Sequence, residues 1–243
     1  MLWNGVDPDL IHRAVRRGTE YRAAKEREIR AVETTRRDIV AYAKQAPGEY
    51  AATLNIAARN REEMEEAMDA IGAWAFGHEG VHELTPTGSP GRVYDAICQS
   101  IGQPQTRRGY FATCEVRWML AEPNKRSAVQ SRASTSNSQS LSLWVPGTAE
   151  ADMEIEVQPK AAAATLTLAL DGDTFFVRDQ STAAGQTVRI VMAKGTVELD
   201  GEDATAETDW QQTRYDTPLT HGQHTLTCNT AAEMTVRWYN RWA

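Results

Sequence analysis

Residues 78–82 read His-Glu-Gly-Val-His, the spacing that zinc peptidases use for catalysis. In those enzymes the string lies within a helix, where two imidazoles one turn apart bind the metal and the glutamate activates a water. Here Gly77 and Gly80 interrupt any helix, and the proline- and glycine-rich segment 85–91 follows almost at once. The context favours a helix-to-loop transition, and a zinc peptidase remains a remote alternative through His78, Glu79 and His82.

A zinc peptidase also needs a third protein ligand, and the two candidates, His221 and His224, fall among the predicted C-terminal strands. The cysteines Cys98, Cys114 and Cys228 are too few and too scattered for a zinc knuckle or a disulfide framework. Their odd number fits a protein made in a reducing compartment. We predict that the protein is not an enzyme and has no catalytic residue, metal or cofactor.

An arginine-rich start, from Arg13 to Arg37, could be interpreted as a phosphate-binding patch. Acidic residues from Glu20 to Asp38 are interleaved with these arginines and offset their charge. Nucleic-acid binding usually requires a concentrated basic face. We therefore expect a surface of ion pairs, solvated or at a subunit interface, and no specific binding of nucleic acid.

Seven tryptophans are many for 243 residues, and exposed aromatic side chains serve as anchors of protein interfaces or as platforms for sugars. Trp118 and Trp238 alternate with other residues in predicted strands, so we assign both to the core. Trp3, Trp144 and Trp210 lie in less regular segments and are the predicted interface residues. A carbohydrate-binding adhesion module that acts through the C-terminal half remains an alternative.

The charge of the chain is uneven. Residues 1–132 carry 19 Lys+Arg against 18 Asp+Glu, whereas residues 133–243 carry 7 against 15, which indicates two modules with different surfaces. No segment approaches the roughly 18 apolar residues that a membrane span needs, and the first residues do not have the pattern of a signal peptide. We expect synthesis in the cytoplasm and no membrane insertion.

The clearest boundary signal is the serine- and glutamine-rich segment 127–143, which offers little to bury and is typical of a linker or long loop. Pro146-Gly147 follow as further turn residues. We place the boundary near residues 140–150 and predict an N-terminal domain over 1–140 and a C-terminal domain over 145–243.

The C-terminal domain shows period-two alternation of apolar and polar residues, separated by turns that contain glycine, aspartate or asparagine. Such runs are typical of antiparallel strands with one buried face. About six of them in roughly 95 residues predict a β-sandwich. The strand runs lie within 165–170, 174–178, 188–192, 197–199, 224–228 and 234–239.

One helix is well marked in the N-terminal domain. Asn60 can act as its N-cap with Glu63 in the third position, apolar residues share one face as far as Trp74, and Gly77 ends it, which predicts a helix over 61–76. Residues 50–57 and 110–120 are predicted strands. Residues 18–45 are ambiguous, because local propensity alone would allow a helix there.

The order of features along the chain resembles the distal tail proteins of siphoviruses, the Dit family. The similarity begins at the aromatic-bearing opening Leu2-Trp3-Asn4-Gly5-Val6 and continues through the strand and helix around 60–76. His224 stands where the family often has asparagine, which is a mild departure. The further segments that carry the resemblance are 84–96, 110–123, 215–219, 222–227 and 236–242.

This resemblance implies a mainly β fold with one prominent helix (α+β), in which a β-barrel-like N-terminal domain forms a ring and a galectin-like β-sandwich follows. It also implies that residues 18–45 are strands, with candidates at Glu28–Glu33 and Asp38–Lys44. The implied function is structural: a homo-oligomeric, typically hexameric ring at the virion tail tip, made in the host cytoplasm, that joins the tail-tube protein to tail-tip, baseplate and host-attachment proteins. DNA would pass through its centre.

Overall fold

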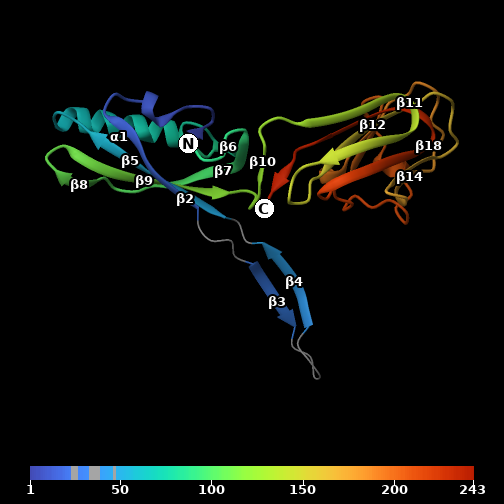
Figure 1. Ribbon diagram of the computed structural model, residues 1–243, viewed down its shortest axis with the longest axis horizontal. Helices are drawn as coiled ribbons and strands as arrows, with labels where there is room; N and C mark the ends of the chain where they lie inside the picture. The colour runs from blue at the N-terminus through green and yellow to red at the C-terminus, as the bar shows by residue number, and fades with distance from the viewer. Residues whose placement is uncertain (23–26, 33–38, 46–47) are drawn as a thin grey trace. The chain divides into compact units, whose positions relative to one another are not determined.

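The computed structural model describes residues 1–22, 27–32, 39–45 and 48–243, and the chain divides into two compact units. Unit 1 comprises Met1–Lys125 and unit 2 comprises Arg126–Ala243 (Figure 1). The expected boundary near residues 140–150 therefore lies inside unit 2. No helix in the described ranges is long and apolar enough to cross a membrane.

Unit 1 is built on one curved antiparallel sheet with the strand order β1-β6-β7-β9-β5-β2, and β8 pairs with β9 at its side. A short 3₁₀ turn, η1 (Pro8–Leu10), precedes β2. The strands are β1 (Leu2–Trp3), β2 (Val15–Arg22), β5 (Glu49–Ala57), β6 (His82–Thr85), β7 (Arg92–Ile101), β8 (Gln105–Arg108) and β9 (Phe111–Leu120). This curved sheet confirms the barrel-like prediction as a half-barrel.

Among the described residues one α-helix forms, α1 (Arg61–Phe76), which has the predicted bounds and lies along the sheet (Figure 1). The Asn60 side chain accepts a hydrogen bond from the Glu63 N–H at 2.8 Å, as an N-cap does. The Glu63 carboxylate accepts in turn from the N–H of Arg59 at 2.7 Å, one residue before the position that a capping box uses. The backbone N–H groups of Arg59 and Glu63, before and within the first turn of the helix, therefore both have side-chain acceptors.

The core of unit 1 is rich in aromatic side chains. Strand β9 alternates strictly, and its inward residues include Trp118, which is fully buried. The ring of Trp118 lies 5.8 Å from Trp3, 5.9 Å from Trp74 of the helix and 6.3 Å from Tyr50 of β5. Edge-to-face and tilted contacts of this kind add to the energy of burial, so Trp118 ties the helix to the sheet.

Residues 18–45, where local propensity would have allowed a helix, are strands wherever the structure describes them. After β2, β3 (Arg27–Val32) and β4 (Ile39–Gln45) pair antiparallel as a separate two-stranded sheet. The two candidate strands of the resemblance are confirmed for these residues, and their ends at Glu33 and Asp38 lie outside the described ones. Pairing with a partner strand has overridden a weak local preference.

Unit 2 is a β-sandwich, as predicted. Its strand order is β14-β13-β18-β12-β15-β16-β17, and β11 pairs with β18 alone. The strands are β11 (Ser131–Val145), β12 (Met153–Pro159), β13 (Leu166–Leu170), β14 (Asp173–Arg178), β15 (Val188–Val191), β16 (Thr196–Leu199), β17 (Glu202–Asp203) and β18 (Gly222–Trp238). The short elements are β10 (Lys125–Ser127), β19 (Arg241–Trp242), η2 (Met192–Lys194) and η3 (Thr205–Glu207).

The two long strands β11 and β18 each take part in both layers of the sandwich. Near its start β18 lies between β13 and β11, where Leu226 faces Leu170 and Leu141. Near its end β18 lies between β12 and β11, where Val236 faces Ile155 and Ala133. The pairing of β11 with β18 is irregular between residues 135 and 140, and there the continuous sheet passes from one layer to the other.

The serine-rich segment is therefore not the predicted linker. Most of it forms the first part of β11, where Ser131 pairs with Trp238 and Ser134 with Thr235. Serine offers little apolar area, but backbone pairing with a long neighbour supplies hydrogen bonds that composition does not reveal. The apolar residues that anchor β11 in the core, Leu141, Leu143 and Val145, come at its end.

Candidate assembly surfaces

The HExxH string spans the turn between α1 and β6. The helix ends at Phe76, Gly80 has φ +88°, and β6 begins at His82, so no helix contains the string and the helix-to-loop interpretation is confirmed. The rings of His78 and His82 lie 5.3 Å apart. The Nε2 atom of His82 lies 2.8 Å from the carbonyl oxygen of Glu79 and is engaged by the turn itself.

Across the described part of the chain, no three His, Cys, Asp or Glu side chains gather in a way that could hold a metal ion. The histidines that might have completed a zinc site have other partners. The Nδ1 atom of His221 lies 3.0 Å from the carbonyl oxygen of Gly147, and Nδ1 of His224 lies 2.7 Å from the Asp171 carboxylate. Both sites lie in unit 2, whereas the string lies in unit 1.

Trp3 is not at the surface, which corrects its prediction as an interface residue. It is 1% exposed, and its ring packs against Trp118 and His82. The reason is the two-residue strand β1, whose register places Trp3 opposite Leu84 of β6. A strand this short leaves no alternation in the sequence, so the sequence could not show that Trp3 points inward.

Trp144 and Trp210 are exposed, at 61% and 60%. Each has an aromatic neighbour: His221 lies 5.8 Å from Trp144, and Tyr215 lies 6.1 Å from Trp210. Trp144 stands near the end of β11, where it pairs with Gln223 of β18. Large exposed aromatic side chains are enriched at binding surfaces, so both remain candidate interface residues.

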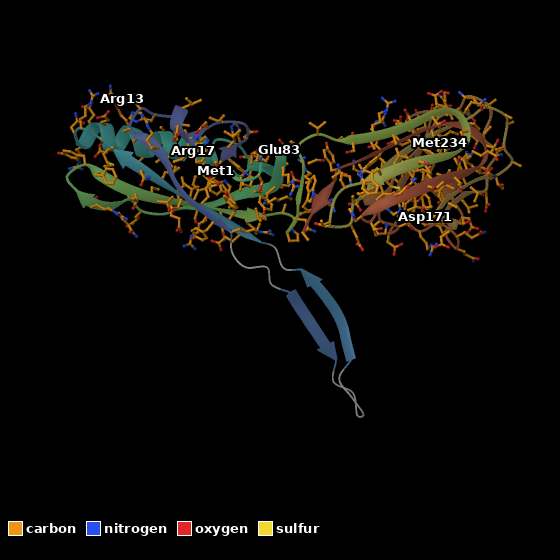
Figure 2. All side chains as sticks on the ribbon, viewed as in Figure 1. Met1, Arg13, Arg17, Glu83, Asp171 and Met234 are labelled. Carbon is orange, nitrogen blue, oxygen red and sulfur yellow. The ribbon has the colours of Figure 1, made fainter. Side chains whose placement is uncertain are left out.

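The two ends of the unit 1 sheet meet at Glu20, a contact that the sequence analysis missed. Glu20 belongs to β2, at one end of the strand order, whereas Met1 (labelled in Figure 2) adjoins β1 at the other end. The Glu20 carboxylate accepts hydrogen bonds from the Met1 amino group at 2.8 Å, from the Tyr50 hydroxyl at 2.5 Å and from the Thr87 hydroxyl at 2.7 Å. We call this contact the Glu20 seam.

The charge of Glu20 is strongly stabilised at the seam. Burial by itself would raise the pKa of Glu20, but the hydrogen bonds from the Met1 amino group, Tyr50 and Thr87 lower it to about 2. Burial, followed by the hydrogen bond to Glu20, raises the pKa of Tyr50. No spacing in the sequence pairs Glu20 with Thr87, because the seam depends on the curvature of the whole sheet.

The outer face of the unit 1 sheet is polar and carries its own counter-charges. The Tyr21 hydroxyl donates to Glu115 at 3.1 Å, Arg117 pairs with the same Glu115, and Arg117 also lies 3.4 Å from Glu49. The hydrogen bond from Arg117 is the main cause that lowers the pKa of Glu115. Beside these residues is an open depression of about 490 Å³ lined by Thr53, Gly102, Gln103, Pro104, Gln105, Thr113, Glu115 and Arg117.

Arg13 and Arg17 form ion pairs, as expected, although their partners are not the interleaved acids. Arg13 pairs with Glu63 of α1 at 2.6 Å, and Arg17 lies 3.3 Å from Asp9 and 3.5 Å from Asp7. Their positive charge is therefore locally offset, which does not favour a phosphate-binding patch.

One outer face of the unit 2 sandwich carries a ladder of alternating charges. Arg189 of β15 pairs with Glu154 at 2.9 Å and with Glu198 at 3.0 Å, and Arg237 of β18 pairs with Glu156 at 2.8 Å. The ladder crosses β16, β15, β12 and β18 in that order. Each of these exposed ion pairs contributes little to stability, but together they make this face of the sandwich charged and hydrated.

The three cysteines are structural. Cys114 and Cys228 are buried, and Cys98 is half-buried. Burial raises the pKa of Cys98 and of Cys114 to about 11, so both thiols stay protonated and poorly nucleophilic at neutral pH.

Comparison with known proteins points to phage tails. Residues 146–242 match the family model described as siphovirus-type tail component, C-terminal domain. No curated protein matches the sequence.

Among solved structures, the whole chain has the fold of the Dit protein of phage SPP1, described as a paradigm of the hub adsorption apparatus in phages that infect Gram-positive bacteria. The TM-score is 0.77 at 11% identity, with 100% of this chain and 98% of that chain covered. A chain of the phage p2 baseplate in its activated conformation with calcium is matched at TM-score 0.44 and 8% identity, over 92% of this chain and 90% of that chain.

Proposed function

We propose that this protein is a structural subunit that forms a ring at the tip of a bacteriophage tail, because its residues 146–242 match the siphovirus-type tail component model and its whole length has the Dit fold. The observation that carries the proposal is the agreement of a family match in unit 2 with a fold likeness that extends over both units. A general β-sandwich would account for the second unit alone.

The proposed ring is held together by repeated contacts between different surfaces of neighbouring copies. Such heterologous contacts generate a closed ring when the rotation between copies closes. Unit 1 is the proposed ring-forming part, and the count of six comes from the resemblance to the Dit family. A central hole passes DNA, and the balanced charges on the outer sheet face around Glu115 and Arg117 suit a surface that DNA passes without binding.

The proposed partners are the tail-tube protein on one side and the tail-tip, baseplate and host-attachment proteins on the other. Trp144 and Trp210 are the proposed anchors of such contacts in unit 2, because both expose most of their ring surface. The protein acts in the virion tail and is made in the host cytoplasm. Its role is mechanical, and no chemical step is assigned to it.

Antibody labelling of intact virions tests the placement. An antibody raised against unit 2 should decorate one point at the far end of the tail, and a phage with a stop codon in this gene should yield tails that lack their tip proteins. Label spread along the tail shaft, or tails with complete tips in the mutant, would contradict the proposal.

A saccharide-binding role of unit 2 is the second candidate, and the exposed Trp210 beside Tyr215 favours it. Aromatic rings that face solvent can stack on sugar rings. A glycan array probed with the full chain would show saturable binding that Trp210→Ala abolishes. A purely structural role predicts that neither the wild type nor the variant binds any glycan.

A further inference from the structure

Unit 2 leaves one long strand edge unpaired. Strand β11 spans 15 residues, Ser131–Val145, and pairs only with β18. Every residue of unit 2 is described, and none of its strands lies on the other side of β11. An unpaired edge presents a row of backbone N–H and C=O groups that can template another strand.

The other two edges of the same sandwich are covered or cut short. The chain after η3 runs along β14: the Asp209 N–H donates to the Val177 carbonyl at 2.9 Å, and the Arg214 N–H donates to the Phe175 carbonyl at 2.7 Å. At the opposite end, β17 is only two residues long, and both of them, Glu202 and Asp203, are acidic and exposed. Both are the usual ways of blocking an edge, and β11 has neither.

The pairing on the far side of β18 shows which groups of β11 face outward. Thr225 uses its N–H and its C=O for Asp171, at 2.7 Å and 2.9 Å, so neither group points toward β11. Its partner across the pair is Ser142. In an antiparallel ladder such a pair exchanges no hydrogen bonds, so the N–H and C=O of Ser142 point away from β18. By the same alternation, the backbone groups of Ser140 and Trp144, two residues away on either side, also point outward. The Ser140 N–H already donates to the Ser138 hydroxyl at 3.1 Å, so only its C=O is available there.

The side chains along this edge of β11 do not prevent another strand from pairing with it. Lysine, proline and inward-pointing charges are the common protective devices, and β11 contains no lysine, no proline and, as its one charge, Arg132 near its start. Apart from Arg132 and Trp144, the exposed side chains of β11 are serines, Asn137 and Gln139, which would fit beside a neighbouring strand. A shallow groove of about 390 Å³ borders the first half, lined by Arg132, Ser134, Thr135, Ser136, Glu233 and Thr235.

The net charge of unit 2 indicates which kind of chain could pair with the open edge of β11. Residues 126–243 carry 9 Lys+Arg against 15 Asp+Glu, a net charge of −6 (9 − 15). Two copies that met edge to edge would bring two such acidic units together, which opposes pairing of β11 with itself. A basic segment from a different protein would instead be attracted, and the exposed Trp144 ring offers a cation–π contact at the end of the edge.

We propose that β11 is a strand-addition site, at which an extended segment with lysine or arginine side chains from another protein of the tail pairs with the outward N–H and C=O groups of Ser142 and Trp144 and with the outward C=O of Ser140. Main-chain hydrogen bonds would supply affinity, and Trp144 would fix the register. This inference rests on the proposed tail function only for the identity of the partner as a tail protein.

Hydrogen exchange compares the purified protein with virion tails that contain it. The amides of Ser142 and Trp144, which point outward, should exchange rapidly in the purified protein, also when it is assembled into rings, and at least about tenfold more slowly in complete tails. The amides of β14 should exchange alike in both samples. Protection of the Ser142 and Trp144 amides that is already present in purified rings would mean that a second copy occupies the edge, and would overturn the inference.

Two variants at one position complete the test. Ser142→Pro removes the outward N–H while leaving the ladder with β18 intact, whereas Ser142→Ala keeps it. We expect rings from both variants, but tails with a missing tip protein from Ser142→Pro alone. If Ser142→Pro disturbs folding, Ser142→Lys, which places a protective charge on the edge, gives the same prediction. Rings that form normally, with the Ser142 and Trp144 amides unprotected in complete tails, would refute the inference and leave the proposed function standing. Failure of the wild type to form rings would refute the ring assembly itself.

Discussion

The two units treat the ends of their sheets in opposite ways. In unit 1 the curved sheet brings its ends together, and the Glu20 seam joins β2 to Met1 and Thr87. In unit 2 the edge at β14 is covered by the following chain, β17 is only two residues long, and the edge of β11 that faces away from β18 is unpaired. The difference shows that the end of a sheet can be closed by side-chain contacts within its own unit, or can remain open to pairing with another chain.

This contrast also separates what each unit can contribute to an assembly. A seam held by a half-buried carboxylate is formed within the unit alone, which suits a part that repeats around a ring. An open strand edge rich in hydroxyl groups lowers the stability of the unit little, because water can hydrogen-bond to its unpaired backbone groups. Those groups form direct hydrogen bonds only when a strand from a partner pairs with them. The substitutions below disturb one side of the comparison at a time, from the largest expected effect to the smallest.

Trp118→Ala should unfold unit 1 selectively. Removal of a fully buried tryptophan that contacts Trp3, Trp74 and Tyr50 should lower the free energy of unfolding by about 3–5 kcal/mol. Scanning calorimetry should show the unit 1 transition lost and the unit 2 transition unchanged. Trp144→Ala is the matched control, because the same truncation at an exposed position should shift neither transition. Equal effects of the two variants would contradict the assigned core.

Arg178→Met should loosen the covered edge of unit 2. The guanidinium group is 2% exposed, donates to the Gln180 carbonyl at 2.8 Å and to the Thr182 hydroxyl at 2.6 Å, and pairs with Glu207. Its loss leaves these acceptors unsatisfied and should cost about 2–3 kcal/mol. Faster hydrogen exchange along β14 would report the change. Arg214→Met, which removes an exposed arginine on the same edge, should have little effect.

Glu20→Gln should open the seam and change the response of unit 1 to acid. The folded pKa of about 2 lies below the ordinary value of 4.5, so this carboxylate contributes stability that is complete above pH 4.5 and is lost as the pH falls toward 2. We expect a loss of about 2 kcal/mol at neutral pH. Acid titration of the unit 1 transition should be flatter in the variant, and an unchanged slope would contradict the role of the seam.

Asp171→Asn should have the smallest effect. The hydrogen bond from His224 lowers the pKa of Asp171, so the carboxylate adds stability above its ordinary pKa and loses it in acid. Its side chain is about half exposed, and water screens the pair, so the loss should stay below about 1 kcal/mol. Asparagine also tolerates the φ of +53° at this position. Thermal melts at pH 7 and pH 3 would show whether the difference narrows in acid.

Patterns that repeat over many residues were predictable from sequence. The helix Arg61–Phe76 has a cap, an apolar face and a terminating glycine, and the alternating strands of unit 2 bury one residue in two. The glycines around the HExxH string likewise placed it outside a helix. Each of these features is encoded within a short window.

Contacts that depend on the whole sheet were not predictable. The two-residue strand β1 buries Trp3 through pairing with β6, far along the chain. The serine-rich segment becomes a strand because β18 lies beside it, although its composition is that of a loop. Glu20 and Thr87 meet only after the sheet has curved. Long-range register, which no local window contains, determines all three.

Image averaging of the purified protein by electron microscopy tests the central claim most directly. The claim predicts closed rings with an open centre and rotational symmetry, either for the protein alone or after tail-tube protein is added. Particles that remain monomers at high concentration and form no ring with the tube protein would contradict it.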